Sequence, residues 1–291
     1  MSTHTDVDIS ALKDRLAQAR LARTPLRAVG AASAVAAKVA VEAGFDALWV
    51  SGLEVSTALG LPDENVLGPR DLTDVVRALT RTAPLPVIVD VDNAGGQVAT
   101  ARRFADDLAH AGAAALCLED SAYPKTNSFA LHRTQELAKP ALMQEQLAVM
   151  RAAAGHEMLL IARTEALICG TDLPEAISRA RTYEQAGADA VLIHSKDTTG
   201  RQALATGAAW TGDVPLVTVP TAFPHLAPQR LGEAGFALAI YANHLSRAAL
   251  AAMRQVAASF SATGSFTADG IPLSDVADLL QVADPAARAC L

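Results

Sequence analysis

The sequence has little of several features that would point to particular classes of protein. Its three cysteines, Cys117, Cys169 and Cys290, are an odd number at wide spacing, which excludes a disulfide framework and gives no zinc-binding pattern. No apolar run approaches the roughly 18–20 residues of a membrane span. Residues 1–8 are polar and lack the basic-then-apolar pattern of a secretory signal. These absences predict a soluble cytoplasmic protein with reduced thiols and no membrane partner.

Positive charge is scarce as well. The chain of 291 residues carries 24 Lys and Arg against 31 Asp and Glu, so its formal net charge is −7. Proteins that bind nucleic acids gather Lys and Arg against the phosphates, so the sequence predicts no nucleic-acid partner. Hydrophobic residues make up 51% of the chain, a share that excludes general disorder and suffices for a sizeable core.

Short apolar runs, each ending in polar or small residues, recur along the whole chain. Continuous runs of this kind are typical of strands buried on both faces, as in a parallel sheet. We expect eight such strands, at residues 27–30, 46–51, 87–90, 114–119, 159–163, 190–194, 216–219 and 238–241.

Alanine-rich segments with apolar residues at i, i+3 and i+4 lie between these strands and predict helices. Several of them end in Ala-Gly, for example at Ala111-Gly112 and Ala186-Gly187, where glycine fits a left-handed helix C-cap. The clearest helical segments are residues 32–43, 71–82, 97–111, 144–154 and 174–186.

Eight strands alternating with helices over about 250 residues are the count of a (β/α)8 barrel. An open doubly wound sheet is the alternative, but it often has a glycine-rich phosphate turn after its first strand, whereas residues 30–33 are Gly-Ala-Ala-Ser. We predict an α/β protein, a (β/α)8 TIM barrel that forms one domain over residues 1–291. A helix at 9–21 would cover the barrel bottom, and helices at 245–260 and 272–280 would extend beyond the last strand.

Acidic side chains end the expected third and fourth strands. In barrels of this kind the chemistry lies at the carboxyl ends of the strands. Asp90, Asp92, Glu119 and Asp120 follow apolar runs, and carboxylates without Cys or paired His suit a hard cation such as Mg²⁺. A single Asp in such a place can simply cap the next helix, but acids concentrated on neighbouring strands favour a metal site.

Two basic side chains, Arg163 and His194, end the fifth and sixth strands and face the same expected mouth. Arginine offers a fixed fork for phosphate or carboxylate, although a structural pair with Glu165 is the alternative. Backbone N–H groups at residues 52–53 would also suit an anion. Such groups opposite a metal predict an anionic oxyacid as the substrate.

The loop after the fourth strand, residues 121–129, is polar and carries Lys125 and Asn127. It is about as long as the lids that close over barrel mouths, which exclude water and complete the site. We therefore interpret it as a lid, and the alternative interpretation is an ordinary surface loop.

These motifs resemble the phosphoenolpyruvate mutase/isocitrate lyase superfamily, and within it the branch of phosphoenolpyruvate mutase and phosphonopyruvate hydrolase. The resemblance covers roughly residues 29–249. The motifs that carry it are AVEAGFDALWVSG at 40–52, LPD at 61–63, DVD at 90–92, ED at 119–120 with PKTNS at 124–128, IARTEA at 161–166, AGADAVLIHSK at 186–196 and VPT at 219–221.

The resemblance implies a barrel whose last helix swaps between subunits, which gives a homodimer or a homotetramer. It also implies Mg²⁺ as the cofactor, held directly by Asp90, with Asp92, Glu119 and Asp63 reaching the ion mainly through water. The substrate that it implies is a small anionic 2-oxo acid or phosphonate.

The same resemblance implies roles for the remaining site residues. Trp49 would form a wall of the pocket. Arg163 and His194 would bind the phosphoryl or phosphonyl group, which Asn127 would contact during its transfer. The substrate's carboxylate and enolate side would meet Ser51, Gly52 and Leu53, and the gating loop would carry Lys125, Asn127 and Ser128.

Two positions depart from the mutase pattern. Ser121 stands where the mutases have Lys after Glu-Asp, and residues 93–96 are Asn-Ala-Gly-Gly where Thr-Gly-Tyr-Gly is usual. The leading prediction is an isomerase that interconverts phosphoenolpyruvate and phosphonopyruvate through a pyruvate enolate. One alternative is hydrolysis of phosphonopyruvate, and others are a C–C lyase acting on a 2-hydroxy or 2-oxo diacid and a non-catalytic barrel. The lyases typically carry a catalytic Cys in the gating loop, which residues 125–128 lack.

Overall fold

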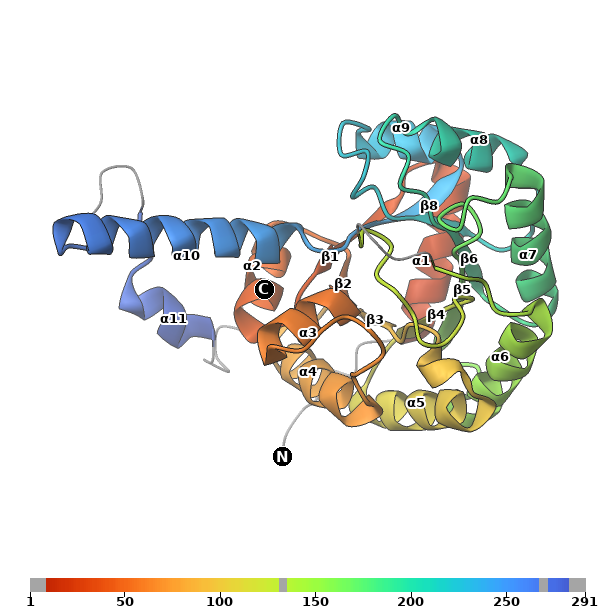
Figure 1. The fold of residues 1–291 in the computed structure, drawn as a ribbon, viewed down its shortest axis with the longest axis horizontal. Coiled ribbons are helices and arrows are strands. Elements are labelled where there is room, and N and C mark those ends of the chain that lie inside the picture. The colour runs from red at the N-terminus through yellow and green to blue at the C-terminus, as the bar shows by residue number, and fades with distance from the viewer. Residues whose placement is uncertain (1–8, 131–134, 267–271, 283–291) are drawn as a thin grey trace.

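The computed structural model describes residues 9–130, 135–266 and 272–282, and it contains a closed barrel of parallel strands in the order β1 to β8. The first strand pairs with the last, with Leu26 opposite Leu238, so the barrel has no open edge. Figure 1 shows the ring of strands surrounded by helices. The predicted (β/α)8 fold is confirmed. The strands are β1 (Leu26–Gly30), β2 (Ala47–Val50), β3 (Val87–Asp90), β4 (Ala115–Glu119), β5 (Leu159–Thr164), β6 (Ala190–Ile193), β7 (Leu216–Thr218) and β8 (Phe236–Tyr241).

Helices follow the strands and cover the outside of the barrel. The Ala-Gly junction at the end of α5 forms as predicted, because Gly112 takes the left-handed backbone of a C-cap, with φ 92°. The helices around the barrel are α2 (Ala34–Glu42), α3 (Gly52–Leu59), α4 (Pro69–Thr82), α5 (Val98–Ala111), α6 (Pro140–Ala154), α7 (Leu173–Gln185), α8 (Arg201–Ala209) and α9 (Pro228–Glu233), with a short 3-10 turn η1 (Ala94–Gly96) before α5.

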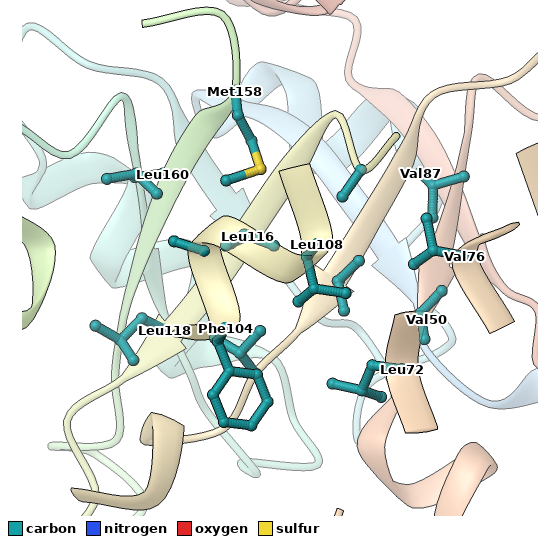
Figure 2. Close-up of a cluster of buried hydrophobic side chains, with 14 of the residues drawn as sticks. Val50, Leu72, Val76, Val87, Phe104, Leu108, Leu116, Leu118, Met158 and Leu160 are labelled. Carbon is teal, nitrogen blue, oxygen red and sulfur yellow. The ribbon is translucent and has the colours of Figure 1, made fainter. Parts of the chain in front are cut away.

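The strands are buried on both faces because alternate side chains pack into different layers. In β2, Trp49 points into the barrel and packs in the inner cluster with Ile88, whereas the next residue, Val50, belongs to the outer cluster. Figure 2 shows this outer cluster, in which β2–β5 meet α4 and α5 through the labelled residues Val50, Leu72, Val76, Val87, Phe104, Leu108, Leu116, Leu118 and Leu160.

An N-terminal helix, α1 (Ile9–Ala22), closes one end of the barrel, as predicted. Its side chains Leu12 and Leu16 are buried in the inner cluster. Arg15 donates to the carboxylate of Asp46, just before β2, at 2.8 Å, which fixes α1 at the amino ends of the strands. The carboxyl ends of the strands therefore remain for the site.

Two further helices follow the barrel. α10 (His244–Thr263) extends away from it (Figure 1), and none of its 20 residues is buried. α11 (Val276–Val282) lies beside α2 and begins later than the predicted start at residue 272. The reason is a cap: the backbone N–H of Asp275 donates to the Asp278 carboxylate at 3.2 Å. Among the described residues, no helix combines the length and the apolar character that a membrane span needs.

One buried carboxyl group lies at the junction of β1, α3 and the segment after β8. Glu54 of α3 is 4% exposed, and its carboxyl group faces Ser246. Gly30 makes room for it, because a Cβ at that position would lie 2.5 Å from Glu54 Oε2. Burial raises the pKa of Glu54 to about 7, and the nearby Ser246 lowers it only in part. The folded protein therefore favours the protonated form.

We expect Glu54→Gln to stabilise the protein at alkaline pH. Because the folded pKa is raised above the ordinary 4.5, the stability contributed by Glu54 is present below that value and is lost as the pH rises through 7. The advantage of the amide should grow by about 2 kcal/mol between pH 5 and pH 8.5, measured by urea unfolding. The exposed control Glu42→Gln should show no such growth, and a pH-independent difference for Glu54→Gln would contradict the assignment.

Candidate active site

Polar side chains gather at the carboxyl ends of the strands around a cavity of about 70 Å³. Such a volume suits a small molecule and is far below the roughly 300–1,000 Å³ of pockets for drug-sized ligands. All of the predicted site residues except Gly52 and Asp92 line it. Those that do are Trp49, Ser51, Leu53, Asp63, Asp90, Glu119, Lys125, Asn127, Ser128, Arg163 and His194.

The loop after β4 contributes residues 125–129 to the lining of this cavity. The ammonium group of Lys125 is buried and forms ion pairs with Asp92 and, at 2.9 Å, with Asp63. The amide of Asn127 donates to the other oxygen of Asp63 at 2.6 Å. Gly52 packs beneath these carboxylates, since a Cβ there would lie 3.2 Å from Asp92 Oδ1. We call Asp63, Asp90, Asp92 and Glu119 the acidic wall, and Lys125 and Asn127 of the loop contact it.

Arg163 is the second cation that pairs with the acidic wall. Its Nε lies 2.5 Å from Glu165 Oε1 and 3.4 Å from Glu119 Oε2, and its Nη1 lies 3.7 Å from Asp90 Oδ2. Its Nη2 lies 2.8 Å from Nδ1 of His194. Nδ1 of His194 also lies 2.8 Å from Glu165 Oε1, and burial lowers the pKa of this ring although Glu165 raises it in part.

Glu165 is the residue whose importance the sequence did not reveal. It is fully buried, contacts Arg163 and His194, and accepts from Ser128 of the loop at 2.8 Å. Burial alone would raise its pKa, but Arg163 and His194 outweigh that effect and hold the pKa well below its usual range. The sequence signal for this residue was its position two residues after Arg163, at the end of β5. That position supported the expected structural pair of Glu165 with Arg163, which the structure contains. It did not indicate the hydrogen bond from Ser128 of the loop.

Asp120 does not belong to the acidic wall, which corrects the sequence-based grouping of Asp120 with the metal-type acids. Successive strand residues point to opposite faces, so Glu119 faces the barrel mouth and Asp120 faces α7. There Asp120 accepts from Tyr183 at 2.7 Å and from Arg179 at 3.1 Å. It also accepts from the backbone N–H of Glu165 at 2.8 Å. Asp120 therefore holds the backbone that presents the site.

The two departures from the mutase pattern contact each other. The hydroxyl of Ser121 donates to Glu119 Oε1 at 2.6 Å, and the amide of Asn93 donates to the backbone oxygen of Ser121 at 3.2 Å. Asn65 then donates to Asn93 at 3.0 Å and accepts from the backbone N–H of Lys125 at 2.6 Å. The unusual residues thus form one network that joins the acidic wall to the loop.

The acidic wall fits a hard cation in its chemistry. Burial raises the pKa of Asp92 to about 6 and that of Glu119 to about 8, even though Lys125 and Arg163 lower them. The positive charge near these carboxylates is therefore too small to balance them. A Mg²⁺ ion would add such charge, and it typically binds one or two carboxylate oxygens directly and keeps several waters. In the part of the chain that the structure describes, no three acidic, histidine or cysteine side chains already converge as a metal site. Lys125 lies between Asp63 and Asp92 instead.

We expect Glu165→Gln to destabilise the protein by about 3 kcal/mol, because it breaks the buried ion pair in which Arg163 Nε lies 2.5 Å from Glu165 Oε1. Urea unfolding at pH 7 measures this change. Glu175→Gln is the matched control, because the exposed carboxylate of Glu175 pairs with Arg179 on the same helix, and pairs with an exposed partner contribute at most about 1 kcal/mol. Equal effects of the two substitutions would contradict the central role of Glu165.

The chain is similar to known proteins of one family. Residues 16–261 match the model of the family described as phosphoenolpyruvate phosphomutase. The chain is 36% identical over 257 residues to a phosphonopyruvate hydrolase of Variovorax sp. (strain Pal2), covering 88% of this chain and 89% of that protein. It is 38% identical over 229 residues to a phosphoenolpyruvate phosphomutase of Streptomyces hygroscopicus, covering 78% and 73%. A crystal structure of phosphonopyruvate hydrolase with oxalate and Mg²⁺ superposes with a TM-score of 0.87 at 34% identity, covering 97% of each chain.

Proposed function

The chain belongs to the phosphoenolpyruvate phosphomutase family and is an enzyme of the phosphoenolpyruvate mutase/isocitrate lyase superfamily, and from this premise we propose its reaction. It interconverts phosphoenolpyruvate and phosphonopyruvate, with Mg²⁺, through a pyruvate enolate. The observation that supports this most is the cavity itself, where the acidic wall and the Arg163–His194 pair meet beneath Asn127.

The acidic wall would hold the metal. We assign Asp90 as the direct ligand, with Asp92, Glu119 and Asp63 reaching the ion mainly through water. When bound there, Mg²⁺ would supply positive charge for the oxygen of the enolate. A related hydrolase is described in complex with oxalate and Mg²⁺, and oxalate has the shape of the enolate's carboxylate end, which supports this assignment.

The start of α3 would bind the substrate's carboxylate. Ser51 is the N-cap of this helix and its side chain makes no capping bond, so the first N–H groups, at Gly52 and Leu53, are free of intrahelical partners. These donors lie at the positive end of the helix. Since Gly52 also packs against Asp92, the carboxylate would lie beside the metal wall.

The phosphoryl group would be held by Arg163, His194 and Asn127. In a loose, metaphosphate-like transition state most of the work is positioning and charge stabilisation, which a fixed guanidinium and an amide donor provide. No proton needs to move in this interconversion, so no general base is assigned. The loop, whose Lys125 and Ser128 contact Asp92 and Glu165, would exclude bulk water from the transfer.

Phosphonopyruvate hydrolysis is the second candidate. The hydrolase relative matches a larger share of this chain than the mutase relative does, 88% against 78%. Hydrolysis would use the same enolate site and requires, in addition, a water within reach of the phosphoryl group.

We expect the purified enzyme with Mg²⁺ to convert phosphonopyruvate to phosphoenolpyruvate. Phosphorus NMR measures this conversion. Asp90→Asn keeps the shape of the side chain but removes the charge of the assigned ligand, so its rate should fall at least about a hundredfold. Phosphate and pyruvate without phosphoenolpyruvate would establish the hydrolase instead. An unchanged spectrum, or a fully active Asp90→Asn variant, would refute the proposed reaction or the metal assignment, respectively.

We also propose that the enzyme is a homodimer or homotetramer in which α10 packs on another subunit. The helix carries no buried side chain, and Leu250, Met253 and Phe260 are exposed on it. Packing on a second copy would remove this apolar surface from water.

Analytical ultracentrifugation tests the role of α10. The wild type should sediment as a dimer or larger, and Met253→Asp should shift it towards the monomer because a charge would be buried at the interface. Gln255→Asp, two residues away and exposed, is the matched control and should not dissociate the assembly. A monomeric wild type would refute the proposal.

A further inference from the structure

The lining of the cavity carries polar atoms that no protein group satisfies. Nε1 of Trp49, Oγ1 of Thr221 and Oδ1 of Asn243 are buried from solvent and have no hydrogen-bond partner. All three residues line the same cavity as Arg163 and His194. Buried polar atoms in native proteins are nearly always hydrogen-bonded to protein, ligand or ordered water. Three such atoms in one small cavity therefore indicate a bound partner.

Asn243 shows that this arrangement does not result from helix capping. It is the N-cap residue of α10, a position where an asparagine side chain usually accepts from the first turn, yet its side chain makes no such bond. The amide is thus not needed for the helix start. Its unpartnered atom is an acceptor, which would repel the oxygens of a phosphoryl group and requires a partner with an O–H or N–H.

The chemistry of the three groups matches water. Trp49 offers a donor, Asn243 an acceptor, and the Thr221 hydroxyl serves as either. The cavity residues after β7 and β8 carry no charge, since they are Val219, Thr221, Ala242 and Asn243. A neutral ligand that both donates and accepts, with two to four polar partners, is what such a site holds.

We propose that Thr221 and Asn243, with Trp49, hold a water molecule in the cavity, and that this water competes with the enolate oxygen for the phosphoryl group, so that the enzyme hydrolyses a share of its phosphonopyruvate. The inference rests on the proposed enolate chemistry. It adds the residues that decide whether the phosphoryl group ends on water or on the enolate oxygen.

The barrel topology places this water on the correct side. In a ring of eight strands, β7 and β8 lie across from β3 and β4, which carry Asp90 and Glu119 of the acidic wall. The phosphoryl-binding residues Arg163 and His194 lie between, at the ends of β5 and β6. An enolate leaving towards β3–β4 and a water arriving from β7–β8 therefore approach phosphorus from opposite sides, as an in-line displacement requires.

The step balances without any other reactant. The water oxygen forms a bond to phosphorus, and the C–P bond breaks with its electron pair passing into the pyruvate enolate. One proton of the water ends on carbon 3, which gives pyruvate, and the other remains on the phosphate. In the competing outcome the enolate oxygen takes the phosphoryl group instead, which gives phosphoenolpyruvate.

The test measures products from phosphonopyruvate and Mg²⁺ in ¹⁸O-labelled water by phosphorus NMR. The wild type should form phosphate carrying one ¹⁸O beside phosphoenolpyruvate. Thr221→Val and Asn243→Leu keep the size of each side chain but remove its hydrogen bond to water. Each should lower the ratio of phosphate to phosphoenolpyruvate on the order of tenfold. If phosphate is the only wild-type product, its release should slow by the same factor. Thr57→Val, on the exposed side of α3, is the control and should change nothing.

A wild type that forms phosphoenolpyruvate alone would overturn the inference, and so would variants that keep the wild-type ratio. A crystal structure with Mg²⁺ and oxalate decides the water site independently of turnover. A water within hydrogen-bond distance of Thr221 Oγ1 and Asn243 Oδ1 supports it, and its absence overturns it. If phosphonopyruvate is not consumed at all, the proposed reaction is wrong. The crystal structure with Mg²⁺ and oxalate still decides whether the water site exists.

Discussion

The burial of charge at the barrel mouth is the constraint on which the rest of the site depends. Carboxylates outnumber cations there, and removing a charge from water is costly unless it is paired. Arg163 is shared among Glu165, Glu119 and Asp90, and Lys125 among Asp63 and Asp92. Electrostatic attraction therefore holds the loop in place, because the Lys125 ammonium group of the loop pairs with Asp63 and Asp92 of the acidic wall. A divalent cation on the same wall would relieve the same deficit.

The scaffold makes this concentration of charge possible. The closed sheet and α1 form a continuous apolar interior below the mouth, so the strand ends are held by packing that does not involve the charged groups. Asp120 and its partners Tyr183 and Arg179 fix the outer side of the β4–β5 junction. Ser121 and Asn93, which differ from the mutase pattern, take up hydrogen bonds to the acidic wall and to each other. The site thus tolerates these substitutions because they remain connected.

The fate of the phosphoryl group depends on which partner reaches it first. A lid that excludes bulk water favours transfer to the enolate, whereas one ordered water inside the lid favours hydrolysis. The two relatives with different activities share this fold and much of this sequence. The groups that we propose to decide between the two outcomes, Thr221 and Asn243, are neutral and line the same cavity.

The sequence by itself determined the barrel fold and most of the residues that line the barrel mouth. Strand and helix periods are local properties, and the rule that chemistry lies at the carboxyl ends of barrel strands selected Asp90, Glu119, Arg163 and His194. Only the tertiary structure decided which way each side chain points and what it contacts. Asp120 faces outward, Glu165 joins the loop to Arg163, and Thr221 and Asn243 remain unpartnered in the cavity. These facts depend on distances between segments far apart in the chain, which no local pattern encodes.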